Sequence, residues 1–215
     1  MLSFLRKVDA LDVFGGLQRH KYAVLHHDQL PYLYLSLGKK IERAGYKPDA
    51  VIGIVRWGNN VANFLSDKYG VPVYSVGATS YTDVYTKRAV RIIQHLGIRL
   101  DEQRVIVADD VGDSGETFSV VKEKEVVPAN PKQIKTACLF KKPWTKPTPD
   151  FWVEETDRWV LFPNKPYENC RHLLKNRPSD PGLEEYGKIL SRELGYPKPI
   201  IEEVLEEFSK HGQEI

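Results

Sequence analysis

One stretch decides the fold of this chain: Val105-Ile106-Val107-Ala108-Asp109-Asp110-Val111-Gly112-Asp113-Ser114-Gly115-Glu116-Thr117. An apolar, mostly β-branched run ends in two adjacent carboxylates, and a third carboxylate precedes Ser-Gly-x-Thr and a helical pattern. This order predicts a strand, a loop and the start of a helix. Backbone N–H groups of such a loop can hold a phosphate, and Asp109 and Asp110 at the strand end suit vicinal hydroxyls or a hydrated Mg²⁺.

The loop itself carries donors for an anion. Gly115 lets the backbone approach the anion closely, and the hydroxyls of Ser114 and Thr117 add hydrogen bonds. Asp113 lies between the carboxylate pair and these hydroxyls, near the reacting atoms. A strand followed by an acidic helix cap is the simpler interpretation. Three aspartates with Ser-Gly-x-Thr at this spacing favour the functional one.

Length and composition are those of a folded globular protein. The chain has 215 residues, 41% hydrophobic and 28% charged, and its net charge of +2 demands neither nucleic acid nor an anionic membrane as partner. No apolar run is long enough to span a bilayer, and the first residues lack the pattern of a signal peptide. Cys138 and Cys170 have no metal-ligand spacing, and Cys138 is expected to be a buried thiol in a strand. We therefore expect a cytoplasmic protein without a membrane partner.

Short apolar runs alternate with amphipathic helical patterns from residue 29 onward. Such alternation predicts an α/β fold with a mainly parallel central sheet flanked by helices, and with functional residues at the carboxyl ends of the strands. The polar segment 79–100 is predicted to be a long loop. The predicted helices cover 29–44, 61–69 and 115–126, and the predicted strands cover 50–55, 71–76, 104–108, 134–140, 151–153 and 159–162.

The region after Phe162 changes character. Its apolar residues fall on three helical faces separated by prolines, which predicts three short helices that must pack on each other or on the core. The expected organisation is an N-terminal segment 1–28, a core 29–142, a hood segment 143–166 and a C-terminal helical appendage 167–215.

The acidic stretch resembles the PRPP-binding motif of the type I phosphoribosyltransferases. In that motif two acidic residues and a hydrophobic pair precede Asp-Thr-Gly-x-Thr; here Ser114 replaces the threonine and Gly112 replaces an aliphatic residue. The resemblance covers residues 29–168 and implies the type I phosphoribosyltransferase fold, a small hood, Mg²⁺ as cofactor and a homodimer. Mg²⁺ would lie near Asp109 and Asp110, held through PRPP hydroxyls and water. The residues implied to bind the ribose and 5′-phosphate of PRPP are Asp109, Asp110, Asp113, Ser114, Gly115, Glu116 and Thr117.

A second matching segment, Arg56-Trp57-Gly58-Asn59, follows the first core strand. The corresponding family loop, Arg-Gly-Gly or Lys-Gly-Gly, binds the pyrophosphate leaving group, so the resemblance assigns that role to Arg56, Trp57 and Gly58. Trp57 replaces a glycine of the family loop. Lys87 and Arg88 belong to the segment that resembles the flexible loop over PRPP, and they would reach the pyrophosphate when that loop closes. A solvated basic pair is the alternative.

Two further segments resemble the nucleobase site of the 6-oxopurine enzymes. Lys141 ends the fourth core strand, where those enzymes place a lysine that recognises the purine O6. Trp159 and Val160 match the hood segment in which an aromatic ring stacks on the purine and the next residue bonds the base through its backbone. The helical tail, in contrast, resembles the adenine phosphoribosyltransferases of crenarchaea. Adenine carries an N6 donor, so its recognition requires an acceptor such as a backbone carbonyl or Asn164.

The resemblance thus implies purine salvage, in which the 5-phosphoribosyl group of PRPP is transferred to adenine to give AMP and pyrophosphate. Asp113 would exchange a proton with the purine near N7 or stabilise the charge that develops there. A 6-oxopurine transferase, favoured by Lys141, and a PRPP-sensing regulator with this fold are the alternatives. Residues 1–28 are too few for a DNA-binding winged helix, and the basic residues are not clustered, so we expect no binding of nucleic acid.

Overall fold

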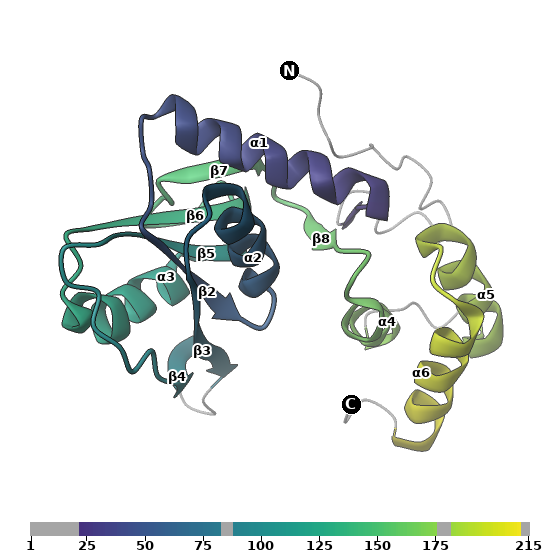
Figure 1. Cartoon of the computed structure of the whole chain (residues 1–215). Coiled ribbons are helices and arrows are strands. Elements are labelled where there is room, and N and C mark those ends of the chain that lie inside the picture. Colours follow the sequence, from purple (N-terminus) through teal and green to yellow (C-terminus); the bar gives the residue numbers. More distant parts are fainter. Residues whose placement is uncertain (1–21, 83–87, 176–181, 212–215) are drawn as a thin grey trace. The chain divides into compact units, whose positions relative to one another are not determined.

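The computed structural model describes residues 22–82, 88–175 and 182–211 (Figure 1). The chain divides into two compact units. The first unit consists of Pro31–Asp157, and the second combines the residues up to Leu30 with those from Arg158 onward. Among the described residues, no helix has both the length and the apolar character that a membrane span requires.

A six-stranded sheet, counted over the described residues, forms the centre of the first unit. Neighbouring strands are parallel throughout except for the pair β3–β4, which is antiparallel. The predicted α/β fold with a mainly parallel sheet is confirmed. In the order in which they lie across the sheet, the strands are β4 (Arg88–Gln94), β3 (Val73–Thr82), β2 (Ala50–Val55), β5 (Arg104–Gly112), β6 (Gln133–Lys141) and β7 (Phe151–Glu155).

Helices cover both faces of this sheet because alternate residues of its buried strands point to opposite sides. On one side Ile52 joins a core with Phe118 of α3 (Glu116–Val121). On the other side Gly53 faces α2 (Gly58–Tyr69), so closely that a Cβ at this glycine would lie 2.9 Å from the Cα of Asn59. Cys138 of β6 is buried, as predicted, and burial raises the pKa of its thiol. The strands that carry the candidate site therefore lie in the interior of the unit.

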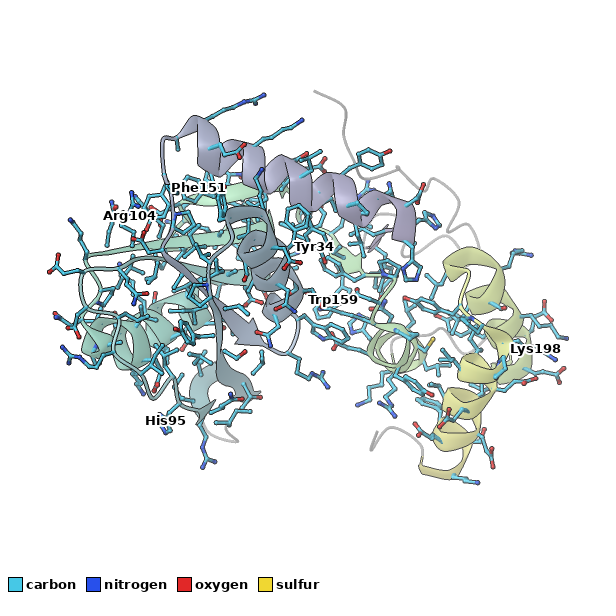
Figure 2. The ribbon with its side chains drawn as sticks, in the orientation of Figure 1. Tyr34, His95, Arg104, Phe151, Trp159 and Lys198 are labelled. Carbon is cyan, nitrogen blue, oxygen red and sulfur yellow. The ribbon has the colours of Figure 1, made fainter. Side chains whose placement is uncertain are left out.

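The helix α1 (Leu30–Arg43) packs on α2 (Figure 2). The rings of Tyr34 and Phe64 stack with their centroids 5.2 Å apart, and Tyr69 donates a hydrogen bond to the carbonyl of Gly38. After Val121 the helix α3 widens into a π-helical segment, Lys122–Val126, and ends in a 3₁₀ turn, Val127–Ala129. The predicted helix 115–126 thus has nearly the expected length but not a uniform geometry.

The segment 79–100 was predicted to be a loop, and this prediction is wrong for most of its described part. β3 continues to Thr82 and β4 begins at Arg88, and the two strands form an antiparallel pair in which these two residues are partners. β4 lies at the edge of the sheet, where only every second residue is covered: Val90 is buried, whereas Arg91 and Ile93 are exposed. Charged residues on the open face of an edge strand conceal its apolar alternation in the sequence.

The second unit contains a short parallel pair and the helical appendage. β1 (Tyr22–Val24) pairs with β8 (Trp159–Leu161), a pairing between segments far apart in the sequence. The three helices predicted after Phe162 are confirmed over the described residues as α4 (Pro166–Lys175), α5 (Leu183–Leu194) and α6 (Lys198–His211). Their apolar faces share one core with β1 and β8, which includes Cys170, Leu173, Tyr186, Leu190 and Val204.

Candidate active site

The acidic stretch occupies the end of β5 and the turn that leads into α3. Asp109 and Asp110 are half-buried residues of the strand itself. The backbone N–H of Asp110 donates to Oδ1 of Asp109 at 2.9 Å, and the N–H of Val111 donates to Oδ1 of Asp110 at 3.0 Å. Each carboxylate is therefore oriented by a backbone donor beside it, and both lie near the carboxyl end of a parallel strand, as predicted. The predicted end of this strand at residue 108 is wrong, because β5 continues through both aspartates to Gly112.

A close backbone contact brings the predicted pyrophosphate loop to these carboxylates. Gly58, the first residue of α2, lies so near β5 that a Cβ would come within 2.5 Å of the carbonyl oxygen of Ala108 and 2.9 Å of the Cα of Asp109. Only glycine fits this position without displacing backbone atoms. The segment Arg56-Trp57-Gly58 is thereby fixed next to Asp109, so two of the predicted site segments meet.

Trp57 adopts an ordinary right-handed conformation, with φ −87° and ψ −23°. The family glycine that it replaces is therefore not required here for its freedom to take a positive φ. The guanidinium of Arg56, an exposed residue, lies 5.8 Å from the centre of the Trp57 ring, and the peptide bond between Val55 and Arg56 is cis. Gly112 belongs to β5 and is likewise not among the residues with positive φ in the described part of the chain.

The predicted phosphate loop, Asp113–Thr117, contacts the turn after β6, for which the sequence predicts no role in the site. Gly115 has a φ of +88°, and a Cβ on it would lie 2.5 Å from the carbonyl oxygen of Lys146. The N–H of Lys146 donates to the carbonyl of Ser114 at 2.9 Å. Ser114 Oγ in turn accepts the N–H of Glu116 at 3.2 Å. The loop is therefore held on one side by the turn that follows β6.

Asp113 has a hydrogen-bond donor and a cation beside it. Its carboxylate Oδ1 accepts a hydrogen bond from the indole Nε1–H of Trp144 at 3.0 Å. Lys142 is buried, and burial lowers the pKa of its ammonium, whereas the negative charges of Asp113 and Asp157 oppose that shift. A carboxylate held in place by an N–H donor is suited to accepting or stabilising a proton on a neighbouring group.

The predicted base-recognising lysine already has a charged partner. Lys141 is buried at the end of β6 and forms a salt bridge with Glu155, its register partner at the end of β7. The side chain of Glu155 is 50% exposed, and the Lys141 ammonium also lies 5.2 Å from the centre of the Trp152 ring. The end of the sheet thus offers a donor and an acceptor side by side. Only the donor, Lys141, was predicted from the sequence.

The remaining predicted nucleobase residues belong to the second unit. Trp159, which Figure 2 labels, is 42% exposed. Its ring stacks on His172 of α4 with centroids 4.3 Å apart and planes 5° from parallel. Burial lowers the pKa of His172. Val160 is buried and pairs with Ala23 of β1. The amide oxygen of Asn164 is buried and, over the described residues, accepts no hydrogen bond.

Lys87 and Arg88 were predicted to approach the pyrophosphate. Lys87 lies outside the described residues. Arg88 is the first residue of β4, and its position in the hairpin is known from the backbone alone. Their predicted role at the pyrophosphate stays a prediction.

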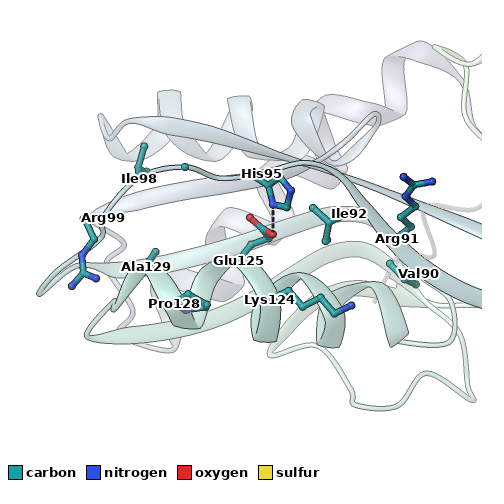
Figure 3. A pocket seen from close by; sticks show the side chains of 11 residues that line it. Val90, Arg91, Ile92, His95, Ile98, Arg99, Lys124, Glu125, Pro128 and Ala129 are labelled. Carbon is teal, nitrogen blue, oxygen red and sulfur yellow. Dashed lines mark hydrogen bonds and ion pairs between the residues drawn. The ribbon is translucent and has the colours of Figure 1, made fainter.

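A groove of about 820 Å³ lies elsewhere on the first unit (Figure 3). It runs between β4, the segment that follows it and the residues after α3, and none of the predicted site residues lines it. Its most prominent polar feature is the pair His95–Glu125, whose Nδ1 and Oε1 are 2.8 Å apart. The carboxyl ends of β2, β5 and β6, rather than this groove, bring together the predicted site residues Arg56 to Gly58, Asp109 to Thr117 and Lys141.

Comparison with known proteins shows the family to which the chain belongs. Residues 36–169 match the family described as the phosphoribosyl transferase domain. A xanthine-guanine phosphoribosyltransferase of Gluconobacter oxydans is 32% identical over 117 residues, which cover 53% of this chain and 66% of that protein, just under two thirds of its length. The structure of a purine phosphoribosyltransferase from Pyrococcus horikoshii is 34% identical with a TM-score of 0.59, covering 66% of this chain and 92% of that one. A xanthine-guanine-hypoxanthine phosphoribosyltransferase from Helicobacter pylori is 25% identical with a TM-score of 0.56, covering 66% and 92% respectively.

The contact between Gly115 and Lys146 yields a stability prediction. Gly115→Ala forces a positive φ on alanine and drives its Cβ into the Lys146 backbone, so we expect a loss of unfolding free energy of about 3 kcal/mol or more. Gly97→Ala is the matched control, because Gly97 also has a positive φ, +64°, but a Cβ there meets nothing within 4 Å. The control should lose only about 1–2 kcal/mol. Urea unfolding measures both, and equal losses would contradict the importance of the Lys146 contact.

Proposed function

Because the chain belongs to the phosphoribosyltransferase family and has the type I fold, we propose that it is a purine phosphoribosyltransferase, which transfers the 5-phosphoribosyl group of PRPP to a purine base. The observation that carries this proposal is the contact of Gly58 with β5, which holds the Arg56 loop against Asp109. A cationic loop beside two carboxylates and a phosphate loop matches the three chemically distinct parts of PRPP. The working assembly is a cytoplasmic homodimer, as the family resemblance implies.

The proposed binding mode assigns one part of PRPP to each segment. The 5′-phosphate binds the loop Asp113–Thr117, where Ser114, Gly115, Glu116 and Thr117 present backbone and hydroxyl donors. The ribose hydroxyls bind Asp109 and Asp110, whose carboxylates are already oriented by backbone N–H groups. The pyrophosphate binds Arg56, Trp57 and Gly58, with Lys87 and Arg88 approaching when PRPP is bound.

The carboxylates at the end of β5 fit Mg²⁺ as a companion of the substrate. Asp109 and Asp110 supply the hard oxygen ligands that Mg²⁺ prefers. The described residues contain no group of three or more side chains that could hold a metal by themselves. The proposal therefore has Asp109 and Asp110 hold the ion through PRPP hydroxyls and water. When bound, Mg²⁺ would neutralise charge on the departing pyrophosphate.

Asp113 is the proposed catalytic residue. As the bond from C1′ to pyrophosphate breaks, positive charge develops on the ribose in an oxocarbenium-like state, and a purine nitrogen captures C1′. The carboxylate of Asp113 accepts the purine proton near N7 or stabilises the charge that forms on the base. As the first residue of the phosphate loop, directly after β5, it lies at the same end of the strand as the ribose-binding carboxylates.

Adenine is the base we propose, and the pair Lys141–Glu155 supports it. The ammonium of Lys141 already has Glu155 as its partner, which weakens its value as a donor to a purine O6. The half-exposed carboxylate of Glu155 is an acceptor of the kind that the N6 amino group of adenine requires. In this proposal the ring of Trp159 stacks on the base and the backbone of Val160 bonds it. Asn164, whose amide oxygen accepts no hydrogen bond from the described residues, is a second acceptor.

A 6-oxopurine substrate is the second candidate. The relatives from Gluconobacter oxydans and Helicobacter pylori are named for xanthine and guanine, and Lys141 matches the lysine that resemblance assigns to O6. In this alternative a base carbonyl would compete with Glu155 for the Lys141 ammonium.

The decisive assay is pyrophosphate release from PRPP and Mg²⁺ with adenine, hypoxanthine, guanine and xanthine offered separately. We expect turnover with adenine. Turnover with the oxopurines alone would replace adenine by the second candidate. Silence with all four bases would contradict the transferase proposal and favour a PRPP-sensing regulator.

Glu155→Ala tests how the base is chosen. If Glu155 accepts the N6 amino group, kcat/KM for adenine falls about 10- to 100-fold, the range of one lost hydrogen bond to a charged group. Glu154→Ala is the matched control, because its side chain leaves the neighbouring position of the same strand on the opposite face of the sheet. An equal loss in both variants, or an unchanged adenine rate in Glu155→Ala, would remove Glu155 from base recognition.

Asp113→Asn tests the catalytic assignment. The amide cannot take the purine proton, so we expect kcat to fall about 10²- to 10⁴-fold while PRPP still binds. Isothermal titration with PRPP and steady-state kinetics separate the two effects. Asp67→Asn on α2, where the aspartate is exposed, serves as control and should keep full activity. Undiminished turnover in Asp113→Asn would exclude Asp113 as the catalytic group.

A further inference from the structure

A half-exposed aromatic side chain contacts the proposed catalytic carboxylate. Trp144 lies in the turn after β6 and is 52% exposed, and its indole Nε1–H donates to Oδ1 of Asp113 at 3.0 Å. The two residues are 31 positions apart in the chain. A hydrogen bond to a carboxylate is roughly twice as strong as one between neutral groups. An indole that is left half in water and aimed at a carboxylate is not explained by packing alone.

The turn that carries Trp144 is fixed to the backbone of the same loop. The hydroxyl oxygen of Thr145 lies 2.6 Å from the carbonyl oxygen of Gly112 and 2.7 Å from that of Asp113, and is thus placed to donate to either. The N–H of Lys142 approaches both the carbonyl of Gly112, at 3.0 Å, and the hydroxyl of Thr145, at 2.9 Å. Trp144 is therefore held between residues that are themselves tied to Asp113.

The indole also has a cation beside its ring. The ammonium of the buried Lys142 lies 6.0 Å from the centre of the Trp144 ring. At this distance the attraction between the cation and the ring is weak. The hydrogen bond to Asp113 is therefore the directional contact of the indole.

We propose that Trp144 is a positioning residue: its indole N–H fixes the rotation of the Asp113 carboxylate before substrate binds. This inference rests on the proposed catalytic role of Asp113. The terminal torsion of an aspartate is broad, so one strong donor can select a single orientation of its two oxygens. A carboxylate that is oriented in advance meets the purine without reorganisation in the transition state, which is where such a contact raises kcat.

Kinetics of Trp144→Phe tests this role. Phenylalanine keeps an aromatic ring and removes the N–H, so we expect kcat to fall about tenfold with KM for PRPP unchanged within about twofold. Tyr32→Phe, which alters another exposed aromatic residue on α1, is the control and should match the wild type. If the wild type is active and Trp144→Phe keeps its kcat, the inference fails while the proposed function stands. A wild type that is inactive with every purine would contradict both the inference and the proposed function.

A double-mutant cycle distinguishes positioning from a structural role. In an Asp113→Ala background the indole has no carboxylate to orient, so Trp144→Phe should then change the residual turnover by less than about twofold. A tenfold loss in both backgrounds would show that Trp144 acts on the fold rather than through Asp113.

Nuclear magnetic resonance examines the hydrogen bond without reference to activity. The indole N–H signal of Trp144 in ¹⁵N-labelled full-length protein is the one that disappears in Trp144→Phe. In Asp113→Ala we expect this signal to shift and its proton to exchange faster with water. An unchanged indole signal in Asp113→Ala would overturn the proposed contact.

Discussion

The close backbone approach of Gly58 to the end of β5 is the contact on which the arrangement of the site depends. Two parallel strands place their carboxyl ends at one edge of the sheet, but they do not by themselves bring the loops that follow into contact. At Gly58 the missing side chain lets the first turn of α2 meet the backbone of Ala108 and Asp109. A methyl group at position 58 would separate the Arg56 loop from the carboxylates. Every charged residue would remain, but the distances between the charged groups would change.

Much of this arrangement could be predicted from the sequence, because its signals are local. The apolar run of β2 has the bounds 50–55 that its residues indicate, and the acidic stretch carries its strand, loop and helix start within thirteen residues. The β3–β4 hairpin could not be predicted in the same way. An edge strand is covered on one face only, so Arg91 and Ile93 can both be exposed there, and the sequence then has no continuous apolar run to mark it.

Contacts between distant segments account for the residues that sequence reasoning missed. Gly115 signals a special backbone position, but its partner Lys146 lies 31 residues away and is set by where β6 ends. Thr145 and Trp144 have the same origin, since both belong to the turn that follows that strand. Glu155 faces Lys141 only because β6 and β7 pair in the observed register. In each case strand pairing brings a side chain of ordinary type to the site, and local sequence patterns do not encode strand pairing.

In the second unit, too, a contact between two different elements orients a predicted site residue. The ring of Trp159, the proposed stacking partner of the purine, does not depend on β8 alone, because one of its faces lies against His172 of α4. A nearly parallel stack at 4.3 Å fixes the plane of the indole and leaves 42% of the residue exposed. Burial keeps the pKa of His172 low, which favours the neutral ring. The helical appendage therefore helps to set the orientation of this one ring.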